Sequence, residues 1–597
     1  MNRTDPASSS LAHFLHDLRD QVLTEMAAQR QQVHAQWEKP LPTRVGDGYA
    51  IENVSLKEIH KNGRVTLTCT RNISRFRPGD ILRLSRNNPF AHDGLMVNLV
   101  EDEETELVIS SEEPVPWEKK FEERDGWTLD IGFIDLSGYV IGALAEAGDT
   151  LVGRERILPL LMGQLQPTID PGLYARGLDI GETLELNWNQ SESLANAYAT
   201  NLAYLVQGPP GTGKTRVLAT LARALAHDGQ RVLICAFTHR AINNALNALV
   251  KQDPDLAAIK VGHPLHTDDL HAPHYDSFNE SPLAEMSGGY VVGATPFATR
   301  TKRLAYVEFD TVIFDEASQI TLPLAVMGML AGHKYIFFGD QKQLPPVLTT
   351  RLTGGALRDS VFGSLIGQNF DTMLTETYRL NEALTAWPSR HFYEGLLTAV
   401  PAAANRHIEY PAPPNRLADV LAADEPKVFW DLGHHNNTVY SQKEAHAVID
   451  LITTLLGCGF PAAEIGVIAP YRAQGRLIRN LLRQFVPDTA VRRHIVVDTV
   501  ERMQGQERDL VILSLTTSNP GFAANVADFF FQPERLNVAI TRPRTKLIIV
   551  GSRFVLNTQT LDPTLQETVT LLESLLESCT YIPATRQAVP EVWQSEW

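Results

Sequence analysis

The stretch Gly208–Thr215, which reads G-P-P-G-T-G-K-T, decides how the rest of the chain is interpreted. It satisfies the pattern G-x-x-x-x-G-K-[ST], follows a short apolar run at 204–207 and opens a segment with helical character. In this context the glycines let backbone N–H groups turn toward phosphates, and the helix N-terminus adds positive potential. The sequence therefore predicts a phosphate-binding loop in which Lys214 contacts the β- and γ-phosphates and Thr215 offers its hydroxyl to Mg²⁺.

Two further polar segments follow predicted strands. The apolar run 312–314 leads into Asp315 and Glu316, where the aspartate can hold Mg²⁺ and the glutamate can orient and deprotonate the attacking water. The run 335–338 leads into G-D-Q-K-Q-L-P-P, in which Gln343 is a candidate sensor of the γ-phosphate. These residues predict hydrolysis and not nucleotide binding alone.

The remaining pattern indicates several structural units. Residues 11–38 have helical spacing, and 46–135 hold short β-rich runs between turn signals, typical of a small β-barrel. From about 181, apolar strands alternate with helices, and a second such series begins near 373. This alternation predicts parallel sheets covered by helices on both faces.

Composition limits the compartment and the partners. No apolar run approaches the ~20 residues needed to span a bilayer, and the start of the chain does not look like a signal peptide. The four cysteines are scattered without metal-ligand spacing, which favours a reducing, cytoplasmic setting. The net charge is −17, yet 471–494 carries six arginines against one aspartate, as either a nucleic-acid contact or a solvated helix face.

Taken together, the order of these motifs resembles superfamily 1 helicases of subgroup B. The branch that it most resembles contains the nonsense-mediated-decay helicase, the immunoglobulin-mu-binding helicase and the helicase part of the replication nuclease-helicase. Further stretches match that pattern in order, at Asn187–Gln190, Thr375–Leu380, Ile465–Gln474, Val497–Ser514 and Arg535–Gly551. One departure is Pro543, which follows Arg542 where many relatives have alanine and which removes a backbone donor.

The resemblance implies an α/β fold with two tandem RecA-like P-loop domains, an N-terminal helical stalk and a small β-barrel accessory domain. We expect a stalk at 1–45, a barrel at 46–150, RecA-like domains at 151–355 and 356–558, and a helical tail at 559–597.

The resemblance also implies roles for individual residues. ATP and Mg²⁺ would lie between the two RecA-like domains. The implied catalytic residues are Lys214, Asp315, Glu316, Gln343, Arg379 and Arg542, with Thr215 and Asp315 as metal ligands. The implied nucleotide-binding residues are Gln190, Gly208, Gly211, Thr212, Gly213, Lys214, Thr215, Tyr378 and Glu507. The expected nucleic-acid contacts are Thr238, Asn244, Thr295, Pro345, Tyr471, Arg472 and Thr499.

The function implied is an ATP-dependent helicase or translocase that moves 5′ to 3′ on single-stranded DNA or RNA, with the monomer as the motor unit. The acidic bulk charge also suggests a recruiting protein partner. Two alternatives stand beside it: an ATPase that remodels nucleoprotein with little unwinding, and a binding module that uses ATP as a switch without hydrolysis.

Overall fold

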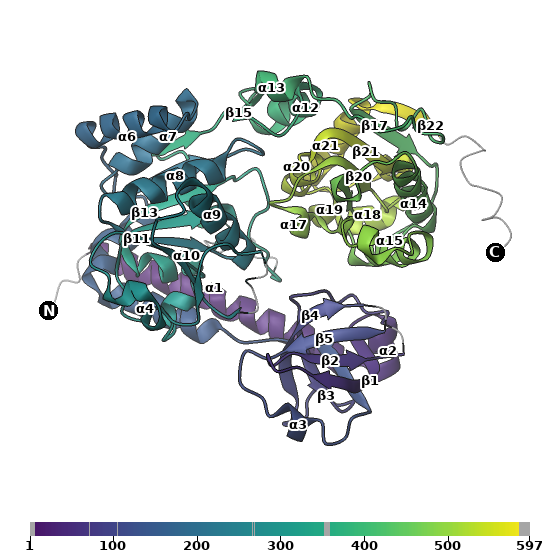
Figure 1. Cartoon of the computed structure of the whole chain (residues 1–597), viewed down its shortest axis with the longest axis horizontal. Helices are drawn as coiled ribbons and strands as arrows, with labels where there is room; N and C mark the ends of the chain where they lie inside the picture. The colour runs from purple at the N-terminus through teal and green to yellow at the C-terminus, as the bar shows by residue number, and fades with distance from the viewer. Residues whose placement is uncertain are drawn as a thin grey trace.

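The computed structural model describes residues 6–70, 72–103, 105–264, 267, 269–350 and 359–583. It contains a closed barrel, two large parallel sheets and a two-stranded ribbon, and Figure 1 shows the barrel below the two sheet domains. The predicted fold class, with an N-terminal helix, a barrel and two RecA-like sheet domains, is confirmed. None of the helices in the described ranges combines the length and apolar character needed to cross a bilayer.

The N-terminal helix α1 (Pro6–Trp37) joins the barrel to the first sheet domain (Figure 1). It packs against α4 (Ser137–Asp149) and α10 (Leu322–Met329), with Leu18 fully buried. The helix expected at 11–38 is therefore present. Because α4 packs on α1 and α10, the last part of the segment assigned to the barrel, 46–150, instead covers the first sheet domain.

The barrel is built from antiparallel neighbours in the order β1-β2-β5-β4-β3-β6. Its strands are β1 (Ala50–Ile59), β2 (Val65–Thr68), β3 (Ile81–Ser85), β4 (Leu95–Asp102), β5 (Glu106–Ser110) and β6 (Trp127–Ile131). Val65 and Leu67 are fully buried at two-residue spacing, as expected for a strand with one face in the core. Helix α2 (Leu41–Gly46) is tied to the wall by the buried Arg44, whose Nε lies 2.7 Å from Asp130 Oδ1.

The first sheet has eight parallel strands in the order β10-β9-β11-β8-β12-β13-β7-β14. Its strands are β7 (Ala203–Gln207), β8 (Arg231–Ala236), β9 (Ala258–Val261), β10 (His274–Tyr275), β11 (Tyr290–Ala294), β12 (Phe309–Asp315), β13 (Gly332–Gly339) and β14 (Asp371–Met373). The predicted boundary at 355–356 lies outside the described residues. Strand β14 comes after that boundary and still pairs with β7, so the first sheet extends into the segment assigned to the second domain.

The second sheet has six parallel strands in the order β19-β18-β20-β21-β17-β22. Its strands are β17 (Lys427–Asp431), β18 (Ile465–Ile468), β19 (Val496–Asp498), β20 (Arg508–Ser514), β21 (Pro543–Gly551) and β22 (Thr580–Pro583). The tail expected to be helical at 559–597 holds α21 (Pro563–Glu577) and also contributes β22, which pairs with β17 at the edge of this sheet.

Helices and a short ribbon connect these strands. The ribbon is β15 (Glu376–Thr377) with β16 (Thr398–Ala399). The helices are α3 (Trp117–Lys120), α5 (Leu158–Leu161), α6 (Pro171–Thr183), α7 (Trp188–Ala199), α8 (Lys214–His227), α9 (His239–Gln252), α11 (Val361–Leu365), α12 (Glu382–Phe392), α13 (Pro401–Ala404), α14 (Gln442–Gly457), α15 (Arg472–Phe485), α16 (Thr489–Arg492), α17 (Val500–Met503), α18 (Pro520–Asn525), α19 (Ala527–Phe530) and α20 (Pro533–Ile540).

Candidate active site

The phosphate loop joins the end of β7 to the first residue of α8, Lys214. Gly211 and Gly213 have φ angles of 75° and 81°, in the left-handed region that favours glycine. A Cβ on Gly211 would lie 2.3 Å from the Cβ of Arg379, so this glycine also allows the close approach of the segment that follows β14. The loop therefore presents its backbone at a helix N-terminus, as an anion-binding loop requires.

Lys214 lies between two carboxylates at the end of β12. Its Nζ is 3.5 Å from Asp315 Oδ1 and 3.2 Å from Glu316 Oε2. Burial alone would lower the pKa of Lys214, but the charges of Glu316 and Asp315 outweigh it and raise that pKa. Burial raises the pKa of Asp315, and the cation of Lys214 opposes that shift. The phosphate loop and the carboxylate pair thus form one charge-compensated cluster.

Two arginines, Arg379 and Arg542, approach this charged cluster from the second sheet domain. Arg379 Nε is 2.6 Å from Glu507 Oε2, and its Nη1 donates to Thr541 O at 3.3 Å. Arg542 is almost fully buried, with its Nε donating to Val538 O at 2.8 Å. Burial, assisted by the like charge of Arg379, lowers the pKa of Arg542 to about 9, so the guanidinium is still protonated at neutral pH.

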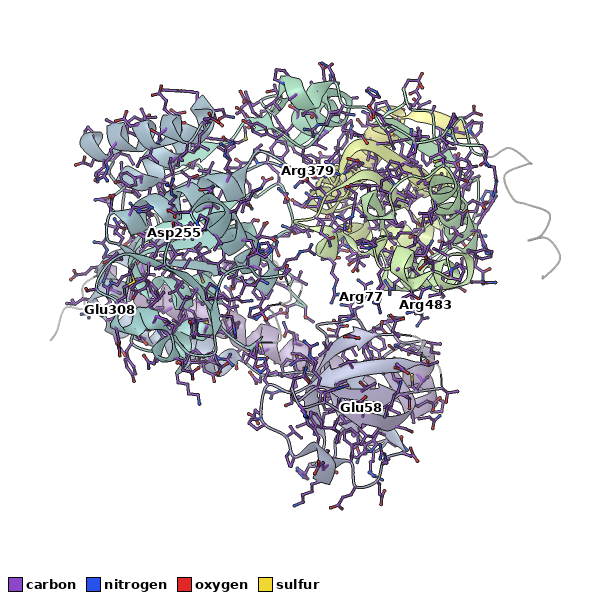
Figure 2. The ribbon with its side chains drawn as sticks, viewed as in Figure 1. Glu58, Arg77, Asp255, Glu308, Arg379 and Arg483 are labelled. Carbon is purple, nitrogen blue, oxygen red and sulfur yellow. The ribbon has the colours of Figure 1, made fainter. Side chains whose placement is uncertain are left out.

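A cavity of about 610 Å³ lies where these groups meet. Its lining joins the phosphate loop and the carboxylates of the first sheet domain to residues of the second, and Figure 2 shows Arg379 where the two domains face one another. The residues predicted for catalysis or nucleotide binding that line it are Gly208, Gly211, Thr212, Gly213, Lys214, Thr215, Asp315, Glu316, Gln343, Tyr378, Arg379, Glu507 and Arg542. The cations and backbone donors that line the cavity fit a polyphosphate chain, and the carboxylate pair fits a divalent cation.

A buried hydrogen-bond network lies beside the cavity, and the sequence did not predict it. Tyr393 donates its hydroxyl to Asp340 Oδ2 at 2.7 Å, and Asn537 Nδ2 donates to the Tyr393 hydroxyl at 2.8 Å. Gln343, which lines the cavity, donates to the same Asp340 oxygen at 2.8 Å. Asp340 follows β13 of the first sheet, whereas Asn537 lies on α20 beside the second. The network therefore links a cavity residue to both domains.

Other functional residues were also missed. Gln504 Nε2 donates to Glu316 Oε2 at 3.1 Å, and Arg406 and Arg544 line the cavity. Gln504 lies within the matched stretch Val497–Ser514, so its position in that motif could have identified it. Arg406 lies in a Pro- and Ala-rich stretch without a recognisable pattern, so only the fold brings it to the site.

Comparisons with known proteins match the two sheet domains. One family model, described as an AAA domain, matches residues 185–287 and 286–351, and a second with the same description matches 357–554. The DNA replication ATP-dependent helicase/nuclease DNA2 of Saccharomyces cerevisiae is 28% identical over 65% of this chain. A regulator of nonsense transcripts 1 homolog of Arabidopsis thaliana is 27% identical over 82% of it. An uncharacterized ATP-dependent helicase of Methanocaldococcus jannaschii is 25% identical over 80%. This chain belongs to superfamily 1B of the helicases.

This superfamily 1B chain spans 27% of the length of the yeast relative, 42% of the Arabidopsis one and 83% of the archaeal one. The matched region, 185–554, contains every residue that lines the cavity. The similarity therefore covers the two sheet domains and the cavity that they share.

Gln190, the expected adenine reader of this superfamily 1B chain, is buried beside the cavity and does not line it. Its side chain forms a capping box with Asn187 at the start of α7, and its Nε2 donates to Thr212 O of the phosphate loop at 2.9 Å. Asn187 in turn donates to the Tyr378 hydroxyl at 2.9 Å. In this arrangement Gln190 supports the loop.

The residues expected to contact nucleic acid lie at the ends of strands in both domains. Thr238 caps α9 by accepting from Ala241 N, and Thr295 accepts a longer bond from Ala298 N. Asn244, on α9, is exposed and instead lines the cavity together with the phosphate loop.

In the second domain the residues expected to contact nucleic acid pack against aromatic rings or against the barrel. Tyr471 stacks on Phe530 with ring centroids 6.2 Å apart and accepts a hydrogen bond from Thr517 Oγ1 at 3.3 Å. Arg472 and Thr499 are contacted by the barrel. The structure therefore groups the residues predicted to be catalytic around one cavity, while those predicted to contact nucleic acid are spread over the two domains.

Proposed function

We propose that this chain is a nucleic-acid-dependent ATPase that translocates 5′ to 3′ on a single strand and unwinds duplexes. The observation that carries the proposal is the shared cavity, in which Lys214 and two carboxylates of one domain face Arg379 and Arg542 of the other. A hydrolytic site divided in this way changes when the domains move, so it can couple ATP turnover to motion.

Each residue has a role that follows from its place. Lys214 and the loop backbone would bind the β- and γ-phosphates, and Thr215 with Asp315 would hold Mg²⁺, which neutralises phosphate charge when bound. Glu316 would accept a proton from the attacking water, and Gln343 would orient that water or the γ-phosphate. Arg379 and Arg542 would stabilise the charge that develops on the transferred phosphoryl group.

The nucleoside would lie on the side of the cavity away from Lys214. Tyr378 lines the cavity and is partly exposed, so its ring is available to stack on adenine. Glu507 would face the ribose, although Arg379 engages it in this structure. The monomer would be the motor unit, because the two sheet domains of the same chain supply both walls of the cavity.

The strand would cross both sheet domains. Thr238, Thr295 and Pro345 would contact it on the first domain, and Tyr471, Arg472 and Thr499 on the second. Small polar groups suit phosphate contacts that position a strand without reading its sequence. An aromatic ring such as that of Tyr471 can stack on any base.

The deciding experiment measures ATP hydrolysis with and without matched single-stranded DNA and RNA at stated salt. Wild-type turnover should rise with at least one strand, and Lys214→Ala should abolish both basal and stimulated turnover. Lys251→Ala removes an exposed lysine from α9 and serves as the matched control. Unchanged hydrolysis by Lys214→Ala would show that the cavity is not the catalytic site.

A second experiment separates unwinding from nucleoprotein remodelling. Duplexes with a 5′ or a 3′ single-stranded tail are compared with single strands that carry a tightly bound protein block. We expect displacement of the duplex strand from the 5′-tailed substrate in proportion to ATP consumed. Removal of the block without strand displacement would favour the remodelling ATPase instead.

A further inference from the structure

The barrel contacts the second RecA-like domain through a small set of charged residues, which we call the latch. Arg77 of the barrel forms an ion pair with Asp498 at the end of β19 and donates to Thr499 Oγ1 at 3.5 Å. Asp80 of the barrel lies 3.2 Å from Arg472 Nη1 and 3.9 Å from Arg502 Nη2. Figure 2 shows Arg77 on the side of the barrel that faces the second domain.

The latch occupies residues that the proposed function needs for the strand. Arg472 and Thr499 are two of the three expected contacts on the second domain, and both are held by barrel side chains. Arg472 also donates to the backbone of Arg75, and Arg502 donates to Pro78 O at 2.5 Å. In this arrangement the loop 75–80 covers positions where phosphates would lie.

The arginine-rich stretch 471–494 acquires its explanation here. Its helix, α15, begins at Arg472. Arg479 on this helix lies close enough to Arg77 of the barrel for its charge to lower the pKa of Arg77. Figure 2 shows Arg483 on the edge of the second domain nearest the barrel. Part of the stretch therefore lies against the barrel of the same chain, while Arg472 remains 49% exposed and Arg493 is exposed.

The contact is polar and has the properties of a dissociable interface. Within the described residues, the buried apolar cluster of the barrel contains no residue of the second domain, and the clusters of that domain contain none from the barrel. Ion pairs without an apolar core are weak and are screened by salt. Interfaces of this kind between domains of one chain normally permit relative motion.

Arg77 is also incompletely satisfied in the docked position. Its Nε and Nη2 are buried without a hydrogen-bond partner among the described residues. Burial lowers the pKa of Arg77 to about 10, Asp498 opposes that shift, and the neighbouring arginines Arg479, Arg472 and Arg502 add to it. A charged guanidinium with unused donors raises the free energy of the docked state.

We propose that the latch is a gate that the phosphate backbone of a single strand opens by taking over Arg472 and Thr499 from the barrel. A strand supplies several phosphates in succession, and each can accept from the arginines that Asp80 holds now. The barrel can swing away because it is joined to the first domain and not to the second by the chain. This inference rests on the proposed function, since it assumes that a strand binds the second domain.

The gate is tested with two barrel variants of opposite charge change. Asp80→Asn keeps the size of the side chain and weakens the pairs with Arg472 and Arg502, while Arg77→Met removes the pair with Asp498. Both should bind oligothymidylate or oligouridylate about 3- to 10-fold more tightly than wild type at low salt, because the docked barrel competes less. The gain for Arg77→Met is diagnostic, since losing a cation should otherwise weaken strand binding.

Matched controls come from an exposed ion pair within the barrel, Arg86 with Glu123. Glu123→Gln and Arg86→Met make the same charge changes away from the latch. Both should bind strands about as the wild type does. Any change should follow the net charge, with slightly tighter binding by Glu123→Gln and slightly weaker binding by Arg86→Met. The proposal is overturned if Arg77→Met binds no more tightly than Arg86→Met.

A closed gate is obtained by crosslinking Arg77→Cys to Asp498→Cys with a short, cleavable thiol reagent. The four native cysteines are buried and free, so the introduced pair should react selectively. Crosslinking should lower strand affinity and strand-stimulated ATPase at least about 10-fold, and cleavage of the linker should restore both. Equal or tighter strand binding by the crosslinked protein would mean that the latch encloses a strand, and would overturn the proposal.

The outcomes also separate this inference from the proposed function. If the wild type neither binds strands nor hydrolyses ATP faster with them, the proposed function fails. If the wild type does both and the latch variants and crosslinked protein behave identically to it, only the gate fails.

Discussion

At the scale of single residues, the site depends on charge compensation across the cavity. Lys214 is held by Asp315 and Glu316, and Arg379 is held by Glu507, so these two cations have carboxylate partners in this structure. A bound nucleotide would place its negatively charged phosphates beside Lys214 and Arg379. Glu316 would then be free of Lys214 and able to serve the water, which makes it the most informative single position.

Glu316→Gln should lower kcat for ATP hydrolysis by about 10²- to 10⁴-fold, because an amide cannot accept the proton of the attacking water. Nucleotide affinity should be retained, since Lys214 keeps Asp315 as a partner. The measurement is steady-state ATPase together with binding of a fluorescent ATP analogue. Glu308→Gln, on the outer edge of the first domain (Figure 2), is the control and should leave both quantities unchanged. Full activity of Glu316→Gln would remove this residue from the mechanism.

Arg542→Lys should reduce kcat by about 10³-fold or more, because an ammonium group cannot reproduce the fixed fork of donors that an arginine offers a transferring phosphoryl group. The charge is kept, so ATP binding should change little. Arg553→Lys alters an exposed arginine of the same domain and should be silent. Equal turnover by wild type and Arg542→Lys would assign Arg542 to the fold, where its Nε already supports Val538 O.

Individual motif residues were predictable where a local pattern carries the chemistry. Lys214, Asp315 and Glu316 follow strands in recognisable stretches, and the structure brings them together. Pro543, which departs from the resembled motif and lacks a backbone donor, is the first residue of β21, a position that strands tolerate for proline. Tyr393 could not be predicted, because its partner Asp340 is 53 residues away and no motif contains it.

At the scale of elements, α1 supports the catalytic domain as well as connecting it to the barrel. Glu25 on α1 accepts hydrogen bonds from Thr349 N at 2.6 Å and from Thr350 N at 2.9 Å. Those residues follow the segment that carries Gln343 and Pro345. The helix therefore fixes the end of a segment that lines both the cavity and the proposed strand path.

Glu25→Gln should destabilise the first domain by about 1–2 kcal/mol at neutral pH, because hydrogen bonds to a charged acceptor are replaced by weaker ones. Burial would raise the pKa of Glu25, but the hydroxyl of Thr350 and the two backbone donors outweigh it and lower that pKa. The stabilisation is therefore complete above the unfolded pKa and is lost as pH falls through the lower folded value.

Thermal unfolding across pH tests this expectation. The difference in Tm between wild type and Glu25→Gln should be largest near pH 7 and should shrink below the ordinary glutamate range. Glu38→Gln changes an exposed glutamate just beyond the same helix and should show neither effect. A difference that persists unchanged into acid would indicate a packing role for Glu25 in place of the charged hydrogen bonds.

Elements were predictable where periodicity extends over enough residues. The β-rich runs within 46–135 and the apolar runs 204–207, 312–314 and 335–338 form strands, and the structure confirms them. Strands β14 and β22 were not predicted, because edge strands of three and four residues carry too few positions for a pattern. Their pairing depends on β7 and β17, which lie far away in the sequence.

At the scale of the whole molecule, the sequence predicted the domains but not how they contact one another. Neither the latch nor the network around Asp340 has a local signal, because each joins residues from separate domains. Both are polar, but the latch is partly exposed, whereas the network around Asp340 is buried. Contacts of this kind can be made and broken during a cycle without disturbing the domains themselves.

Tyr393→Phe should weaken the coupling between strand binding and hydrolysis. The hydroxyl of Tyr393 accepts from Asn537 and donates to Asp340, which also receives Gln343 from the cavity wall. Removing it leaves the apolar ring packed and cuts the path through Tyr393 to Asp340, while the direct hydrogen bond from Asn537 Nδ2 to Lys342 O remains. We expect the ratio of strand-stimulated to basal ATPase to fall about 10-fold, the equivalent of one hydrogen bond to a charged group.

Tyr410→Phe is the matched control, because the Tyr410 hydroxyl is buried without a hydrogen-bond partner among the described residues. Its ratio of stimulated to basal turnover should equal that of the wild type. A ratio unchanged by Tyr393→Phe would show that the Tyr393 hydroxyl carries no coupling between the domains. A ratio that falls while strand affinity is preserved would place Tyr393 between the two events, because neither the cavity nor the strand path has lost a contact.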